Sequence, residues 1–292
     1  MEKTIETPFD LNGCSTPVTL SGEGIAVVLL HGGPGSFDYL EGLVDLLPPG
    51  MMAIRYDQRG GGRAGHDGPF TIAQLIDDLE ALRRQLDLEG WIVAGHSWGA
   101  FLALAYAARY PEHTHMLLQI SGSGLDPDWQ KTYHTNRRKR LPPAEQIEFL
   151  HLRQERENVC EGKQAGVERR LLEINLKADF HDPAKIANLP DLLAHPPNRE
   201  AAEALLADWN QSLLDPAFRQ AVAGLAMPVL CLHGTADPRP ATGEQTLGEV
   251  LPQGRFVALA DAGHYPWIEQ PQAVRQALAS FLLPLFHELG WA

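Results

Sequence analysis

Cysteine is scarce in this sequence, which contains three cysteines among its 292 residues. Cys14, Cys160 and Cys231 are odd in number and widely spaced, and no CxxC pair occurs. A disulfide framework and a cysteine-based zinc site are therefore not expected, and this usage is typical of proteins from a reducing compartment. Cys231 lies within an apolar run and is expected to be a small core residue.

Long apolar runs are also absent. No stretch approaches the ~18 residues that a helix needs to cross a bilayer. Residues 1–6 lack the basic and apolar regions of a secretory signal peptide. We therefore expect a cytoplasmic protein with no membrane partner.

The chain also has no excess of positive charge. The chain has 24 Lys and Arg residues against 37 Asp and Glu residues, a formal net charge of −13. Such a chain repels a phosphate backbone, so nucleic acid is not expected as its partner. Residues 137–140 form one basic run (RRKR), a pattern that can indicate a nucleic-acid patch or a localisation signal. Its acidic surroundings favour a solvated helix or loop face.

Motifs that hold nucleotides or metals do not occur. The glycine-rich residues 60–63 are not followed by the GK[ST] of a P-loop, and no GxGxxG opens a helix after a strand. His113 and His115 are near neighbours, but neither an HExxH motif nor a carboxylate cluster accompanies them. We therefore expect neither a cofactor nor a metal ion.

The composition is that of a globular protein with a large core, with 44% hydrophobic and 21% charged residues. Short apolar runs alternate with helical patterns, which predicts βα units and a mainly parallel sheet. A helix is expected from Thr71, which has the spacing of a capping box with Gln74, another from Trp98, and a last one from about Pro271 that Pro284 ends or kinks. The expected strands are residues 25–30, 52–56, 91–94, 116–120, 228–233 and 256–259.

The alternation of strand-like runs with helical patterns stops between residues 125 and 225. This segment has no strand-like run, contains two Pro-Pro breaks, and holds more than half of the chain's Lys and Arg residues. A composition shift of this kind between strands predicts an inserted helical lid. The expected organisation is one sheet domain, residues 1–124 and 226–292, with a helical cap formed by residues 125–225.

The strongest chemical signal is the run GHSWG at residues 95–99, directly after a predicted strand and before a predicted helix. This is the context of a nucleophile elbow, a strained turn that exposes the hydroxyl of Ser97. Gly95 and Gly99 supply the small residues that the turn needs. The amide of Trp98, at the start of the helix, is expected to stabilise an oxyanion. The alternative is a chance GxSxG, which glycine-rich proteins often contain.

The run HGGPG at residues 31–35 follows the first long strand. An oxyanion hole needs a second amide from the loop after this strand, and we expect Gly33 to provide it. Neighbouring glycines such as Gly32 let the main chain approach a substrate. The alternative is a simple Gly/Pro turn.

A serine nucleophile needs a base, and the base needs a carboxylate that orients it. Asp237 follows the strand at 228–233, and His264 follows the last strand, so they have the required chain order. Asp126, after the strand before the lid, is a competing acid, whereas Asp261 is too close to His264 in the chain. His96 is expected to be a packing residue of the elbow.

These motifs resemble those of the proline iminopeptidase family of α/β-hydrolases. Residues 31–35, 57–60 (DQRG), 95–100 and 263–267 (GHYPW) carry the resemblance, which covers residues 20–124 and 226–285. It implies an α/β-hydrolase fold, that is, a mainly parallel central sheet with helices on both faces and an inserted helical lid. It also implies a serine hydrolase that removes N-terminal proline through an acyl-enzyme.

The resemblance implies further that acidic lid residues hold the free amine of the substrate. Glu173 and Glu203 are the candidates by position, and the alternative is that both are solvated carboxylates. The family's Trp-rich lid motif ending in glutamate is not found here; residues 170–173 (RLLE) stand near its place.

Aromatic residues near the motifs offer a pocket for a pyrrolidine ring, or else belong to the core: Phe37, Trp98, Tyr265 and Trp267. The first functional hypothesis is therefore an aminopeptidase or amidase that acts on a small molecule or short peptide with N-terminal proline or a similar residue. The second is a carboxylesterase for small neutral esters. The third is a non-catalytic ligand-binding protein, which would not need a base-activated serine. No oligomeric state follows from the sequence.

Overall fold

Eight strands form one sheet in the computed structural model, which describes residues 4–158, 161–192, 195, 197–288 and 290. Their order across the sheet is β1-β2-β4-β3-β5-β6-β7-β8. Neighbours from β4 to β8 pair in parallel, whereas β2 pairs antiparallel with both β1 and β4. The predicted α/β class is therefore confirmed. The strands are β1 (Thr4–Leu11), β2 (Cys14–Gly22), β3 (Ile25–Leu30), β4 (Met51–Tyr56), β5 (Trp91–His96), β6 (Thr114–Ile120), β7 (Val229–Gly234) and β8 (Gly254–Leu259).

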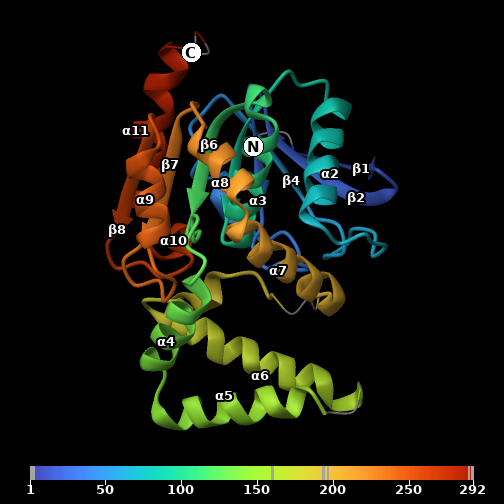
Figure 1. Ribbon diagram of the computed structural model, residues 1–292, viewed down its shortest axis with the longest axis vertical. Helices are drawn as coiled ribbons and strands as arrows, with labels where there is room; N and C mark the ends of the chain where they lie inside the picture. The colour runs from blue at the N-terminus through green and yellow to red at the C-terminus, as the bar shows by residue number, and fades with distance from the viewer. Residues whose placement is uncertain (1–3, 159–160, 193–194, 196, 289, 291–292) are drawn as a thin grey trace.

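Helices cover both faces of the sheet (Figure 1). Successive side chains of a strand point to opposite faces. In β3, accordingly, Val28 and Leu30 belong to one buried cluster, to which α2, α3 and α9 contribute, while Val27 and Leu29 belong to another, completed by α1 and α11. We call the sheet with these helices the sheet domain. The helices are α1 (Glu41–Val44), α2 (Ile72–Gln85), α3 (Trp98–Arg109), α9 (Thr242–Val250), α10 (Pro266–Glu269) and α11 (Pro271–Glu288).

The described residues between β6 and β7 form helices and connections without a strand. The α5–α6 pair lies farthest from the sheet (Figure 1), where it has a small buried cluster of its own. α7 and α8 instead return to the sheet domain, and the ring of Trp209 lies 5.1 Å from that of Phe101 in α3. These inserted helices are α4 (Trp129–Arg140), α5 (Pro143–Arg156), α6 (Glu161–Asp179), α7 (Arg199–Leu214) and α8 (Pro216–Ala223), with the 3-10 helix η2 (Pro183–Asn188).

The basic run at residues 137–140 ends α4 and is only partly a solvated face. Arg138 and Lys139 are exposed, as expected, but Arg137 is buried. Arg137 lies 4.2 Å from the ring centre of Phe149 and donates to Asn175 Oδ1 at 2.8 Å. Arg140 donates to the carbonyl oxygens of Ala236 and Phe180, so it ties α4 to the loop after β7.

The N-terminal hairpin of β1 and β2 was not among the predicted strands. Seven of the eight β1 residues are exposed or half-buried, so this edge strand lacks the apolar pattern of the inner strands. Arg59 of the DQRG run connects the hairpin to α2. Its Nη2 donates to Leu11 O at 2.9 Å, and its Nε donates to Asp78 Oδ2 of α2 at 2.7 Å. Both charged side chains are buried and paired.

Two local predictions need correction. The Thr71 side chain does cap α2 by accepting from the Gln74 amide at 3.2 Å, but the Gln74 side chain donates to Asp78 Oδ1 and does not complete a capping box. Pro284 was predicted to end or kink the last helix; the first alternative is wrong, because α11 runs through this residue to Glu288. Proline has no backbone N–H to donate within the helix. The packing of neighbouring Leu282, which is fully buried, holds this turn of α11 in place.

Candidate active site

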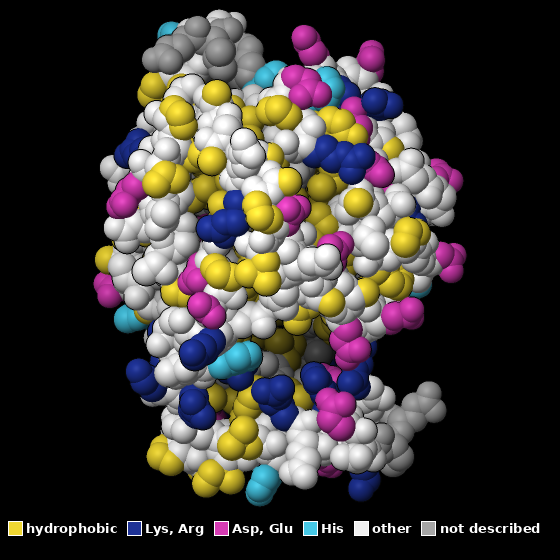
Figure 2. Space-filling model, in the orientation of Figure 1, with side chains coloured by type: hydrophobic (Ala, Val, Ile, Leu, Met, Phe, Trp, Pro, Cys, Tyr) yellow, Lys and Arg dark blue, Asp and Glu magenta, His cyan; other side chains and the backbone are white. Residues whose placement is uncertain are grey.

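The predicted site residues follow four strands of the sheet. Gly33 comes after β3, Ser97 after β5, Asp237 after β7 and His264 after β8. Because these strands are parallel, their carboxyl ends meet at one edge, where ligands bind in open α/β sheets. Figure 2 shows a hollow between the sheet domain and the α5–α6 pair, with hydrophobic side chains inside it.

Ser97 occupies a strained turn between β5 and α3. Its φ of 56° and ψ of −118° lie in a region that side-chain-bearing residues rarely adopt. Gly95 and Gly99 make the turn possible: a Cβ on Gly95 would lie 2.0 Å from Gly99 O, and one on Gly99 would lie 2.0 Å from Leu30 O. His96 and Trp98 are buried, whereas Ser97 is partly exposed. The turn therefore presents the serine hydroxyl at the surface of the site.

His264 and Asp237 form a close buried pair, with 2.6 Å between His264 Nδ1 and Asp237 Oδ2. The carboxylate accepts the Nδ1 proton, so Nε2 is left as the basic nitrogen of a neutral ring. The competing acid is placed differently: Asp126 Oδ1 accepts from the amide of Asp128 at 2.9 Å. The side chain of Asp261 is 74% exposed. Of these three carboxylates, Asp237 is the one that contacts His264.

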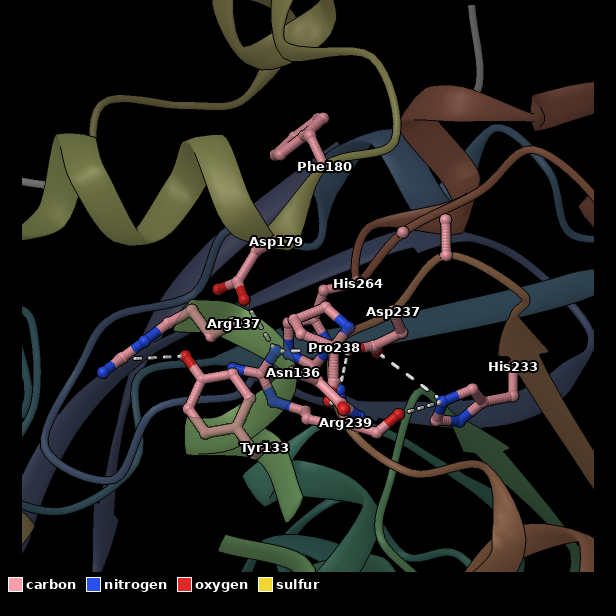
Figure 3. Close-up of polar contacts among 12 residues, drawn as sticks. Tyr133, Asn136, Arg137, Asp179, Phe180, His233, Asp237, Pro238, Arg239 and His264 are labelled. Atoms are coloured by element: carbon pink, nitrogen blue, oxygen red, sulfur yellow. Dashed lines mark hydrogen bonds and ion pairs between the residues drawn. The ribbon is translucent and has the colours of Figure 1, made fainter. Parts of the chain in front are cut away.

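Two cationic side chains flank Asp237 (Figure 3). Its Oδ1 accepts from the amide of Arg239 at 2.8 Å and lies 3.4 Å from Arg239 Nη1, which also binds Asp179 Oδ1 at 3.1 Å. On the other side, His233 Nδ1 pairs with Glu244 Oε2 at 2.7 Å, and His233 Nε2 lies 3.9 Å from Asp237 Oδ2. The contact with Asp179 could not be predicted, because Asp179 belongs to α6 and is distant in the chain.

The charges around this pair fix its protonation. Burial alone would raise the pKa of Asp237, but its interactions with His264 and Arg239 hold it well below its ordinary value. Burial, and then Arg239, lower the pKa of His264 below the usual histidine value. Burial would lower the pKa of His233 too, but the bond to Glu244 raises it to about 9. The result is an ionised Asp237 beside a neutral His264 at neutral pH.

The backbone amides of Gly33 and Trp98, in the two loops at Ser97, have no acceptor among the described residues. Gly33 has a φ of 66°, and Trp98 is the first residue of α3, where helical amides are unpaired. Gln58 of the DQRG run joins the two loops. It accepts from Trp98 Nε1 and donates to His31 O, each at 2.9 Å.

The predicted aromatic pocket residues are largely buried. Phe37 is 9% exposed and lies 5.2 Å, between ring centres, from His195 in the connection before α7. Tyr265 and Trp267 are 6% and 4% exposed and surround the ring of His96. Trp98 is 1% exposed. Tyr265, Trp267 and Trp98 therefore support the site from the core, which was the alternative reading of these residues.

The two predicted amine-binding carboxylates lie on exposed helix faces. Glu173 is paired with Arg170 at 3.1 Å, and Glu203 with Arg199 at 2.7 Å. Their side chains are 49% and 64% exposed. These positions do not support contact with a substrate amine, since each carboxylate already has a partner on its own helix. By contrast, Gly32 adjoins Ser97, because a Cβ added to it would lie 2.9 Å from Ser97 Cβ.

The described residues contain no group of three or more His, Cys, Asp or Glu side chains placed to hold a metal ion. None of their helices has the length and apolar character that crossing a membrane requires.

The chain belongs to the α/β-hydrolase family: the family described as alpha/beta hydrolase fold matches residues 25–271. It is a hydrolase whose relatives include proline iminopeptidases. The enzyme of Lactobacillus delbrueckii subsp. bulgaricus is 28% identical over 275 residues, which cover 88% of this chain and 89% of the relative. That of Saccharolobus solfataricus is 42% identical over 134 residues, or 44% of this chain and 43% of the relative.

A solved structure extends the comparison to the fold. The proline iminopeptidase of Mycobacterium smegmatis superposes with a TM-score of 0.69 at 20% identity, covering 99% of this chain and 100% of that one. The predicted α/β-hydrolase fold and the resemblance to the proline iminopeptidases are thereby confirmed.

Proposed function

We propose that the protein is a serine hydrolase that forms an acyl-enzyme on Ser97. The observation that carries the proposal is the 2.6 Å contact between His264 and Asp237 at the sheet edge where Ser97 stands on its strained turn. A nucleophile on an elbow, a neutral histidine and an ionised carboxylate are the three parts that this chemistry needs.

The mechanism follows from the positions of these groups. Ser97 Oγ attacks the substrate carbonyl carbon, and His264 Nε2 takes its proton. The amides of Gly33 and Trp98 hold the oxyanion, each contributing about 3 kcal/mol in the transition state. His264 then protonates the leaving nitrogen or oxygen. A water molecule, deprotonated by His264, attacks the acyl carbon and frees Ser97.

The substrate that we favour is a small molecule or short peptide with a free N-terminal amine, proline or a similar residue. The relatives named proline iminopeptidase support this choice. Local charge supports it as well, because the three carboxylates of Asp179, Asp237 and Glu244 outnumber the two cations Arg239 and His233 that pair with them. The excess negative charge favours a cationic amine. In this proposal, residues 125–225 act as the cap over the site.

A carboxylesterase for small neutral esters is the second candidate. The observation in its favour is that Glu173 and Glu203 already have arginine partners, and Asp179 shares its charge with Arg239. A site without a free carboxylate has no counterion to offer an amine. A non-catalytic ligand-binding role is the third candidate, and it predicts that Ser97 does not react with a serine-directed phosphonate.

A panel of three substrates separates these candidates: proline 4-nitroanilide, N-acetylproline 4-nitroanilide and 4-nitrophenyl acetate. We expect phosphonate labelling of Ser97 and hydrolysis of the free-amine anilide in preference to its acetylated form. Asp179→Asn is expected to raise KM for the free-amine anilide about 10-fold, the effect of losing one charged contact, and to change KM for the acetate much less. Asp261→Asn, on an exposed carboxylate, is the control. Equal KM values for both anilides would favour the esterase.

The charge of Arg239 is expected to set the acid limb of the pH profile. The base acts in its neutral form, so kcat/KM rises as the pH increases through the pKa of His264. Arg239 lowers that pKa. Arg239→Gln should therefore move the acid limb to higher pH, whereas Arg239→Lys, which keeps the charge, should leave it near the wild-type position. A profile of Arg239→Gln that overlays the wild-type one would contradict this role.

A further inference from the structure

Two buried side chains beside the site have no part in the mechanism above. Tyr39, in the loop after β3, is 5% exposed, and His96, the last residue of β5, is fully buried. The Tyr39 hydroxyl accepts from the amide of Gly32 at 2.9 Å and lies 2.7 Å from His96 Nδ1. His96 Nε2 lies 2.8 Å from the carbonyl oxygen of His264. These three contacts join the loop after β3, the elbow and the loop after β8.

The contacts fix one order of protons. The carbonyl oxygen of His264 can only accept, so His96 Nε2 carries the ring proton and donates it there. Nδ1 of the neutral ring is then the acceptor for the Tyr39 hydroxyl proton, while the Tyr39 oxygen accepts from the amide of Gly32. Burial lowers the pKa of His96 well below the usual histidine value and raises the pKa of Tyr39. Both groups therefore stay neutral, and His96 has one tautomer.

Aromatic rings enclose this chain of hydrogen bonds. Trp267 is stacked on Tyr39 with 6.4 Å between ring centres, and it meets His96 edge-on at 4.6 Å. Tyr265 lies 5.3 Å from His96 and 6.1 Å from Tyr39. Hydrogen bonds in such a dry site are strong and costly to break. The rings thus hold Tyr39 and His96 in one arrangement.

The Tyr39 hydroxyl is also in close contact with the loop that carries the oxyanion amide. A Cβ on Gly32 would lie 2.3 Å from this hydroxyl and 2.9 Å from Ser97 Cβ. Gly32 is therefore confined between Tyr39 and Ser97, and Gly33 follows it directly in the chain. A shift of the Tyr39 hydroxyl would displace the Gly33 amide relative to the serine.

We propose that Tyr39 and His96 are positioning residues that set the Gly33 amide and His264 at fixed places relative to Ser97. The inference rests on the proposed serine chemistry and adds to it a group outside the triad. The pair acts on the transition state, because the oxyanion forms only there. Ground-state binding of the substrate does not require it.

Tyr39→Phe tests the proposal, with Tyr106→Phe as the matched control. Tyr106 is also buried, and its hydroxyl donates to Glu80 Oε2 at 3.0 Å in the contact between α3 and α2. We expect Tyr39→Phe to lower kcat about 10- to 100-fold with little change in KM, the cost of a small misplacement of catalytic groups. Affinity for a boronic acid that binds Ser97 as a tetrahedral adduct should fall by a similar factor. Tyr106→Phe should change neither quantity.

The outcomes separate this inference from the proposed function. A wild-type protein whose Ser97 resists the phosphonate overturns the serine mechanism, and the pair loses its role with it. If Ser97 of the wild type reacts with the phosphonate but Tyr39→Phe leaves kcat and boronate affinity unchanged, only the positioning role is overturned. The nitrogen chemical shifts of His96, measured by NMR, give a second readout. Nε2 should be protonated in the wild type. Protonation at Nδ1 instead would also overturn the positioning role.

Discussion

Ser97→Ala is expected to reduce kcat by about 10⁶-fold, as the loss of a serine nucleophile does in comparable triads. The change removes only the hydroxyl of a residue that is partly exposed. Folding should therefore be preserved. Hydrolysis of the best substrate from the three-compound panel, measured together with thermal unfolding, tests both halves of the prediction.

Ser97→Gly is the informative companion of the alanine variant. Both lack the nucleophile, but only glycine adopts a φ of 56° with a ψ of −118° at little cost. The glycine variant should be equally inactive and more stable than the alanine variant by about 1 kcal/mol. Turnover near the wild-type rate in either variant would exclude Ser97 as the nucleophile.

The elbow and the inner strands could be predicted because their signals are local. Gly95 and Gly99 are required by contacts within a single turn, and the apolar inner strands stand out from the helical segments between them. Asp237 and His264 could be placed from chain order alone, since each follows a strand of one parallel sheet. Their close contact is then a consequence of the sheet, in which β7 and β8 are neighbours.

The remaining parts of the site depend on contacts between distant segments. Asp179 reaches Arg239 only because α6 ends beside the loop after β7, and no periodicity in residues 125–225 indicates where α6 lies. For the same reason, the position of Glu173 in the chain did not predict its pairing with Arg170 on an exposed face. His96 was expected only to pack, because its hydrogen-bond partner Tyr39 comes from another loop.

Asp237→Asn is expected to lower kcat by about 10⁴-fold with little loss of structure. In the wild type, Asp237 Oδ1 receives the amide of Arg239 at 2.8 Å and lies near its guanidinium. The asparagine will keep its oxygen on that side, because both Arg239 groups are donors. Its amide nitrogen must then face His264 Nδ1.

That orientation gives His264 the wrong tautomer. A donor opposite Nδ1 requires Nδ1 to be the unprotonated nitrogen, so the proton moves to Nε2, which can no longer accept the proton of Ser97. The nitrogen chemical shifts of His264 by NMR should show this exchange of protonation beside the loss of kcat. Asp126→Asn is the control, because that carboxylate caps a turn and has no contact with His264. A large loss of kcat in the Asp126 variant together with an active Asp237→Asn variant would assign the acid to Asp126.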